Sequence, residues 1–368
     1  MQTTDNKRTA PYFSVIVPAY RCAAYLPKCL GSLDAQSFRD FETLLAVELS
    51  PDDSLAICRR WAEGKDATVG DLPVSGGVAA SRNWGFGLAR GRYVVMLDGD
   101  DWLEADALSV LAEAIARAKD PDIVQFGLTN VFELSDGTLE RRGETFNLPK
   151  EADGQVFSAF DFIRGLARTG QHAKNYAVLS VCRTDFLRQH NLLQRVELQS
   201  EDSEWSPRAW LSAGRIAFVA KPLYNYRRHD GGITSQGSTK ILYSTAAIAA
   251  RLAKHFASLE LPWDVRRQVE NDALAIFNWY LFNGLYVRRF SNADRRAALA
   301  VVFADAETEA AYRRLWASAS RFKRCGLPLV VFARRTGILL PAVVYFRYLY
   351  YPLTKLKGRI RLWSTGLV

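Results

Sequence analysis

Residues 93–101 read YVVMLDGDD, an apolar run that passes directly into three carboxylates within four positions. The apolar part, Tyr93–Leu97, is typical of a strand that is buried on both faces of a sheet. Three other short apolar runs predict further strands of this kind: Phe13–Pro18, Phe41–Val47 and Ile123–Phe126. Helical stretches separate these runs, which predicts βαβ units and a mostly parallel sheet flanked by helices, in the α/β class.

The helical stretches lie where the connections of such a sheet are expected. They cover Tyr25–Leu33, Ser54–Ala62, Val78–Leu88 and Glu104–Ala118. Asp52 and Asp53 are suited to cap the start of the second of these helices. Parallel sheets bind ligands beyond the carboxyl ends of their strands. We therefore expect the polar clusters after Val17, Val47 and Leu97 to lie close together.

The pattern changes along the rest of the chain. Leu128–Leu134 and Thr138–Arg142 resemble a hairpin, and helical signals follow at Phe157–Leu166 and Asp185–His190. Four further helices are predicted beyond Thr239, at Ile241–Phe256, Trp263–Arg288, Ala293–Ala304 and Glu307–Lys323. These signals predict a disordered N-terminus at 1–11, an α/β domain at 12–235 and a helical region at 236–368.

Composition narrows the class of protein. Over 368 residues the chain is 49% apolar and 24% charged, which excludes wholesale disorder and collagen-like repeats. Its five cysteines form no CxxC pair, which argues against a disulfide framework or a zinc site and fits a reducing compartment. The polar start, MQTTDNKRTA, lacks the features of a signal peptide, so we expect a cytoplasmic location.

The positive charge is concentrated at the C-terminal end. Residues 310–368 hold twelve Lys and Arg and no acid, whereas residues 1–309 hold 36 bases against 39 acids. The uncharged stretch Thr336–Phe346 is too short to cross a bilayer, which takes about 20 apolar residues. With its flanking bases and aromatics it resembles an interfacial segment, so 327–368 is expected to bind an anionic surface on the inner membrane face. A helix packed on the core is an equal alternative. Nucleic acid is not expected, because no recognised binding fold accompanies the charge.

The cluster Asp98-Gly99-Asp100-Asp101 carries the first chemical signal. Three carboxylates at a strand end repel one another unless a cation lies between them. Mg²⁺ and Mn²⁺ prefer carboxylate and phosphate oxygens, so an Asp-x-Asp at this place can hold a metal that binds a diphosphate. The alternative is a turn whose aspartates cap a helix beginning at Trp102–Leu103.

Several motifs together resemble one known family. SVIVPAY at 14–20, GGVAASRN at 76–83 and YVVMLDGDD at 93–101 are similar, in order and spacing, to motifs of the inverting family 2 glycosyltransferases. SEDSEW at 200–205 and LYNYRRHDGGIT at 223–234 resemble later motifs of the same family. The resemblance covers about 12–235 and implies the GT-A fold, a Rossmann-like sheet flanked by helices, here with a C-terminal helical extension.

This resemblance implies a role for each matching residue. The donor nucleotide and its diphosphate would be bound by Pro18, Ala19, Tyr20, Glu48, Arg82, Asp98, Gly99, Arg228 and His229. Asp100 would be the principal ligand of Mg²⁺ or Mn²⁺, with Asp98 beside it. Asp202 would be the base that deprotonates the acceptor hydroxyl, and Glu201 would orient Asp202 or touch the acceptor. The alternatives are an N-cap of the helix Ser203–Leu211 for Asp202 and a surface-loop histidine for His229.

One position departs from the family pattern. The family's V-D-D-G-S aligns with Val47-Glu48 in AVELSPDDS, so the first Asp is absent and the second is Glu. That second carboxylate usually accepts a hydrogen bond from uracil. Glu48 keeps the acceptor, while Leu49 in place of Gly stiffens the loop. Asp52 and Asp53 fall on the following turn and cannot substitute. UDP remains the expected nucleotide.

The resemblance therefore implies an inverting glycosyltransferase that moves a sugar from a nucleotide donor to a saccharide or lipid-linked saccharide acceptor in polysaccharide or glycan assembly. A second hypothesis is a non-catalytic scaffold that binds a nucleotide sugar or a glycan, supported by the altered Val47-Glu48 pair. A third, a nucleotidyltransferase, would need a Gly-rich start, and the first strand leads instead into Pro18-Ala19-Tyr20.

Overall fold

The computed structural model of the chain describes residues 10–73, 76–169, 173–229, 239–282 and 290–317. The chain divides into two compact units, Met1–Glu197 with Glu201–Gly232, and Leu198–Ser200 with Ile233–Val368. Several predictions lie wholly or partly outside the described residues, among them the disorder of 1–11, the end of the motif at 223–234, and the membrane segment 327–368.

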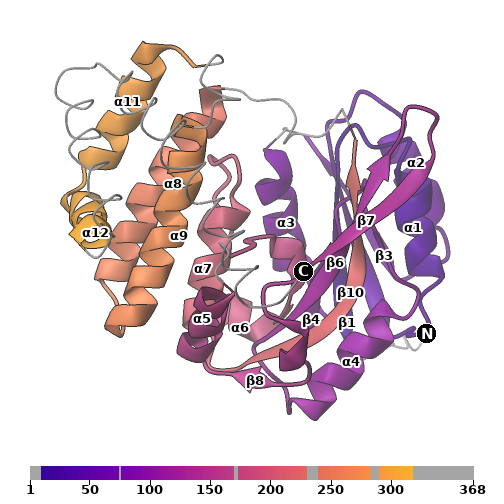
Figure 1. The fold of residues 1–368 in the computed structure, drawn as a ribbon. Coiled ribbons are helices and arrows are strands. Elements are labelled where there is room, and N and C mark those ends of the chain that lie inside the picture. The colour runs from indigo at the N-terminus through magenta and orange to yellow at the C-terminus, as the bar shows by residue number, and fades with distance from the viewer. Residues whose placement is uncertain (1–9, 74–75, 170–172, 230–238, 283–289, 318–368) are drawn as a thin grey trace, which may run out of the picture. The chain divides into compact units, whose positions relative to one another are not determined.

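The first unit is built on a mixed sheet, with the strand order β3-β2-β1-β4-β9-β6-β10-β5 and with β7 and β8 paired to β6 and β10 (Figure 1). Its strands are β1 Phe13–Ala19, β2 Phe41–Glu48, β3 Ala67–Leu72, β4 Tyr93–Met96, β5 Trp102–Leu103, β6 Ile123–Glu133, β7 Leu139–Thr145, β8 Val156–Phe157, β9 Ser180–Arg183 and β10 Ile216–Arg228. β1 to β4 are parallel, and β6 runs parallel to β10. The expected α/β fold with a central sheet is confirmed.

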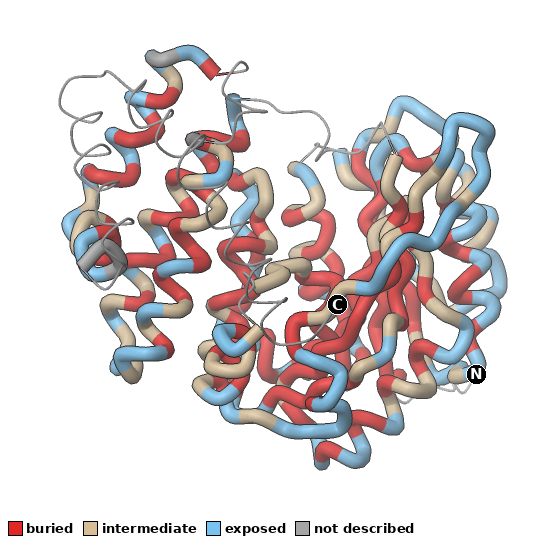
Figure 2. The backbone as a smooth tube through the Cα atoms, in the orientation of Figure 1, coloured by how far each residue is buried: buried red, intermediate tan, exposed pale blue. Residues whose placement is uncertain are grey.

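The register of the parallel strands places their carboxyl ends at the same edge of the sheet. Phe13 lies opposite both Phe41 and Tyr93, so β1, β2 and β4 start level with one another. Each of these strands is almost wholly buried, as Figure 2 shows for the centre of the sheet. Burial of apolar side chains on both faces thus explains the continuous apolar runs in the sequence. The polar clusters that follow these strands lie at one edge of the sheet.

Seven helices of the first unit, among the residues described, cover the two faces of the sheet. They are α1 Leu26–Asp34, α2 Ser54–Ala62, α3 Gly77–Leu88, α4 Ala107–Arg117, α5 Ala159–Arg168, α6 Thr184–Gln189 and α7 Asp202–Ser212, with short 3₁₀ turns at Lys150–Ala152 and Ala177–Leu179. In Figure 1, α1, α2 and α4 lie on one face and α3, α5 and α7 on the other.

One predicted helix begins later than expected. Glu104–Ala118 was predicted as helical, but α4 starts at Ala107 because Trp102–Leu103 forms β5 and pairs antiparallel with Tyr224 and Asn225. The alternative in which the aspartate cluster caps a helix at Trp102 is therefore wrong.

The described part of the second unit is helical. It comprises α8 Thr239–Ala257, α9 Trp263–Phe282, α11 Asn292–Phe303 and α12 Ala306–Ala317. These helices share a buried apolar cluster that includes Leu242, Phe277, Leu299 and Tyr312. The expected C-terminal helical region is thus present, although the predicted ends at Arg288 and Lys323 lie outside the described residues. Within the described helices, none combines the length and the apolar character needed to cross a membrane.

Candidate functional site

The loop that follows β4 packs tightly against the end of β1. A Cβ atom on Gly99 would lie 2.9 Å from the carbonyl oxygen of Pro18 and 3.0 Å from Sγ of Cys22, so a larger residue would force the loop away. Pro18 and Ala19 are buried at this contact, and the side chain of Tyr20 is 43% exposed just beyond it. The structure therefore brings the predicted donor residues of the two strand ends together.

Asp101, the last carboxylate of the loop, is buried and has a structural role. Its two oxygens accept hydrogen bonds from the Tyr224 hydroxyl at 2.6 Å and from the backbone N–H of Arg227 at 2.7 Å. Burial, together with the charges of Asp100 and Asp98, raises the pKa of Asp101 well above its usual range. Asp101 thus fixes the position of β10 beside the loop.

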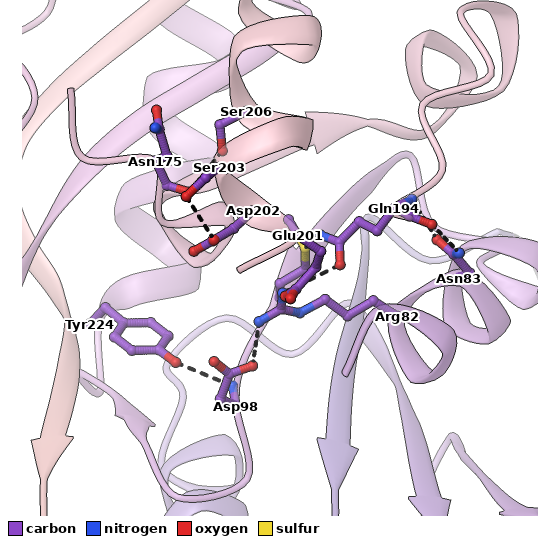
Figure 3. Close-up of polar contacts among 11 residues, drawn as sticks. Arg82, Asn83, Asp98, Asn175, Gln194, Glu201, Asp202, Ser203, Ser206 and Tyr224 are labelled. Carbon is purple, nitrogen blue, oxygen red and sulfur yellow. Dashed lines mark hydrogen bonds and ion pairs between the residues drawn. The ribbon is translucent and has the colours of Figure 1, made fainter. Parts of the chain in front are cut away.

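Arg82 connects two parts of the site. This buried side chain of α3 donates from Nη2 to Oδ1 of Asp98 at 2.7 Å and from Nη1 to Oε1 of Glu201 at 3.1 Å (Figure 3). Burial lowers the pKa of Arg82, but the charges of Asp98 and Glu201 outweigh it, so the pKa is raised. Arg82 therefore stays cationic and links the loop after β4 to the residue that precedes Asp202.

The neighbouring Asn83 holds the segment before α7. Its Nδ2 donates to the carbonyl oxygen of Gln194 at 2.8 Å, and its Oδ1 accepts from the backbone N–H of Gln194 at 2.8 Å. The Gln194 side chain also accepts from Arg82 at 3.4 Å. Sequence reasoning missed Gln194. The only available signal was the Arg-Asn pair of the GGVAASRN motif, whose two side chains both contact it.

Asp202 is the first residue of α7, and Glu201 occupies the N-cap without a side-chain capping bond. The alternative that Asp202 itself is the N-cap is therefore wrong. Asp202 is partly exposed, whereas Glu201 is buried. Burial and the nearby Glu201 charge raise the pKa of Asp202 to about 7, and Arg82 opposes this increase. A carboxylate that titrates near neutral pH can act as a general base.

His229 contacts Asp100. Its Nε2 lies 3.2 Å from Oδ2 of Asp100, and its side chain is only 12% exposed. The alternative of a surface-loop histidine is wrong. The adjacent Arg228 points elsewhere, with its guanidinium over the Tyr226 ring at 4.6 Å and Nη2 donating to Oδ1 of Asn130 at 3.3 Å. The structure therefore brings His229, but not Arg228, to Asp100.

Glu48 lies against the start of α3. Its Oε1 accepts from the Ser81 hydroxyl at 2.7 Å and its Oε2 from the backbone N–H of Gly77 at 3.1 Å, and the side chain is buried. Gly77 has φ +76°, a conformation that favours glycine. The contact of Glu48 with a nucleotide base stays a prediction. Asp52 does lie on the following turn, where it accepts from the backbone N–H of Ala23 at 3.0 Å.

The residues near Asp100 fit a divalent metal. The Asp100 carboxylate is 36% exposed and is the type of ligand that Mg²⁺ and Mn²⁺ prefer, and the His229 nitrogen beside it belongs to a common metal-binding side chain. Asp98 is less available, because Arg82 occupies its Oδ1. Within the described ranges, no group of three or more His, Cys, Asp or Glu is arranged to hold a metal. Substrate phosphates and water would have to complete the coordination, as is common for Mg²⁺.

Residues 14–188 match the family model described as Glycosyl transferase family 2. The chain is 24% identical over 269 residues to glycosyltransferase GlyA of Streptococcus pneumoniae, covering 72% of this chain and 37% of GlyA. It is 29% identical over 231 residues to glycosyltransferase EpsJ of Bacillus subtilis, covering 61% of this chain and 63% of EpsJ. It is 27% identical over 221 residues to poly(ribitol-phosphate) beta-N-acetylglucosaminyltransferase TarS of Staphylococcus aureus, covering 58% of this chain and 35% of TarS. The chain thus spans less than two thirds of the length of each of these relatives.

Solved structures show the same fold. The crystal structure of Staphylococcus aureus TarS 1-349 in complex with UDP-GlcNAc aligns with a TM-score of 0.69 at 20% identity and covers 90% of both chains. TarS 1-349 in complex with UDP gives a TM-score of 0.66 at 19% identity, covering 90% of this chain and 89% of that chain.

Proposed function

Since residues 14–188 are a family 2 glycosyltransferase domain of the GT-A fold, we propose that the protein is an inverting glycosyltransferase. It moves a sugar from a UDP-sugar to a saccharide or lipid-linked saccharide acceptor in polysaccharide or glycan assembly. The main support for this proposal is that Arg82 forms two ion pairs, with Asp98 at 2.7 Å and with Glu201 at 3.1 Å. Glu201 directly precedes Asp202. The family resemblance implies donor chemistry on the Asp98 side and acceptor chemistry on the Asp202 side.

On the donor side, the ends of β1 and β2 would hold the nucleotide. Pro18, Ala19 and Tyr20 would line the base and ribose. UDP is supported by the TarS structures with UDP and UDP-GlcNAc, which share the fold. Asp100 would hold Mg²⁺ or Mn²⁺ with His229 beside it, and the bound metal would neutralise negative charge on the diphosphate.

On the acceptor side, Asp202 would remove the proton from the attacking hydroxyl. The acceptor oxygen then forms a bond to the anomeric carbon as the bond to the UDP oxygen breaks, which inverts the configuration. A single catalytic carboxylate is sufficient here. A glycoside hydrolase typically needs two, because one acts on the water or the sugar while the other protonates the leaving group. Glu201, held by Arg82, would keep the start of α7 and therefore Asp202 in place.

Calorimetry with UDP, GDP, CDP and dTDP, each in Mn²⁺ and in EDTA, tests the proposal. We expect UDP to bind and its affinity to fall strongly when EDTA removes the metal. Binding of a different nucleotide would contradict the choice of UDP. Absence of binding to all four would favour the scaffold hypothesis in its glycan-binding form. That hypothesis rests on Val47-Glu48, and the intact Asp100 and Asp202 oppose it.

We further propose that 327–368 attaches the protein to the inner face of the cytoplasmic membrane. The support is the charge of 310–368, with twelve bases and no acid. Truncation after Arg324 should release the protein from vesicles that contain anionic lipid, measured by co-sedimentation. The full chain on neutral vesicles is the control, and unchanged binding of the truncated chain would contradict the membrane role.

A further inference from the structure

Tyr25 makes a contact that neither the family resemblance nor the proposed chemistry assigns. It occupies the N-cap position of α1, where its side chain makes no capping bond. Its hydroxyl instead lies 3.2 Å from Nδ1 of His229, and the two ring centroids are 4.7 Å apart. The contact joins residues that are 204 positions apart in the sequence.

The Tyr25 ring is itself held in place. The guanidinium of Arg227 lies 4.8 Å from the Tyr25 ring centroid and 5.3 Å from that of Trp102. Nε of the same guanidinium donates to the carbonyl oxygen of Asp100 at 2.9 Å. Arg227 therefore couples the position of the Tyr25 ring to the loop that carries Asp100.

Each ring nitrogen of His229 therefore lies within hydrogen-bonding distance of a polar partner. Nδ1 faces the Tyr25 hydroxyl, and Nε2 faces Oδ2 of Asp100 at 3.2 Å. A histidine that binds a ligand through one nitrogen is usually oriented by the hydrogen bond of the other. A tyrosine hydroxyl can donate or accept, so it can pair with Nδ1 in either tautomer. Tyr25 thus keeps Nε2 directed at Asp100 whether or not Nε2 carries a proton.

We propose that Tyr25 is a positioning residue for His229. It holds Nε2 beside the Asp100 carboxylate, so that the two side chains together meet the metal-bound diphosphate of the donor. This inference rests on the proposed function, because the ligand it invokes is the donor of that reaction. In this proposal Tyr25 acts through His229 and not on the reacting atoms.

The test is a Mn²⁺ titration by electron paramagnetic resonance at a fixed, saturating concentration of UDP. Tyr25→Phe removes the hydroxyl and keeps the ring. We expect it to weaken the apparent Mn²⁺ affinity by about 10- to 100-fold, the usual effect of removing a group that orients a metal ligand. Tyr93→Phe is the matched control, because its hydroxyl donates to the carbonyl oxygen of Pro121 at 2.9 Å, at the opposite end of the strands. This variant should keep the wild-type affinity.

A double-mutant cycle separates positioning from a general structural role. In the His229→Ala background, Tyr25→Phe should change the Mn²⁺ affinity less than about twofold, because its effect passes through the missing imidazole. Equal losses in both backgrounds, or no loss in the wild-type background, would overturn the inference while leaving the proposed function intact. Failure of the wild-type protein to bind Mn²⁺ with UDP would overturn both.

Discussion

Replacing Asp202 with asparagine is expected to abolish sugar transfer while UDP still binds. Asparagine has nearly the same shape but cannot accept the acceptor proton, and loss of a general base usually lowers kcat by about 10²- to 10⁴-fold. Release of UDP in the presence of Mn²⁺ and acceptor measures the effect. Calorimetry of UDP with the variant is the control, since the donor residues are unchanged. Turnover near the wild-type rate would remove Asp202 as the base.

The pH dependence of the wild-type enzyme gives a second test of the same residue. The base works only when deprotonated, and burial with the Glu201 charge raises the pKa of Asp202 to about 7. We therefore expect kcat/KM to be level above pH 7 and to fall about tenfold per unit below it. A profile that is flat from pH 5 to pH 8 would contradict this assignment.

Replacing Arg82 with alanine is expected to lower the free energy of unfolding of the first unit by about 3–5 kcal/mol, the usual result of removing one partner of a buried ion pair. The Arg82 side chain is 5% exposed and that of Glu201 is 9% exposed, so little water can replace the lost contacts. Urea unfolding followed by tryptophan fluorescence measures the change. Activity at pH 7 should fall as well, because Arg82 opposes the increase in the pKa of Asp202.

Arg59→Ala is the matched control for this experiment. Arg59 also pairs with an aspartate, Asp71, but the two side chains are 61% and 49% exposed. Exposed pairs contribute about 0–1 kcal/mol, so this variant should unfold close to the wild type. Equal stability of the two variants would contradict the structural role of Arg82.

The direction in which pH changes the stability loss of the Arg82→Ala variant follows from the protonation of Glu201. Burial already raises the pKa of Glu201 in the folded protein, and the arginine lowers it. Without Arg82, the folded-state pKa rises further above the unfolded value. The loss of stability should therefore be largest at high pH and shrink as pH falls and Glu201 takes up a proton.

Strands β1, β2 and β4 and the start of β6 could be predicted because each is a buried apolar run. β3 (ATVGDL), β9 (SVCR) and β10 (IAFVAKPLYNYRR) were missed, as were the two-residue strands β5 and β8. β3 is a partly exposed edge strand, and β9 is a four-residue strand inserted antiparallel between β4 and β6, so neither shows a long apolar run. β10 begins with the apolar run Ile216–Ala220, which Lys221 and Pro222 interrupt. A continuous apolar run therefore indicates a buried strand, but a buried strand need not show an unbroken run.

The candidate site could be predicted only in part, because local sequence patterns do not show contacts between distant residues. The sequence places Asp98, Asp100 and Asp101 in one cluster, with Asp100 and Asp98 expected to hold a metal, but the structure gives the three different partners: Arg82, His229 and Tyr224. These partners are 16, 129 and 123 positions away, so no local pattern could assign them. Gln194 and Tyr25 were missed for the same reason, because their roles arise only from contacts with distant residues.

The hydrogen bonds of Glu48 bear on attempts to re-engineer which nucleotide the protein accepts. A designer guided by family consensus would restore aspartate at position 48. The shorter side chain would withdraw its oxygens from Ser81 and from the backbone N–H of Gly77, and the helix that carries Arg82 would lose its anchor to β2. Substitutions at position 48 should therefore be selected in libraries that also vary the first turn of α3.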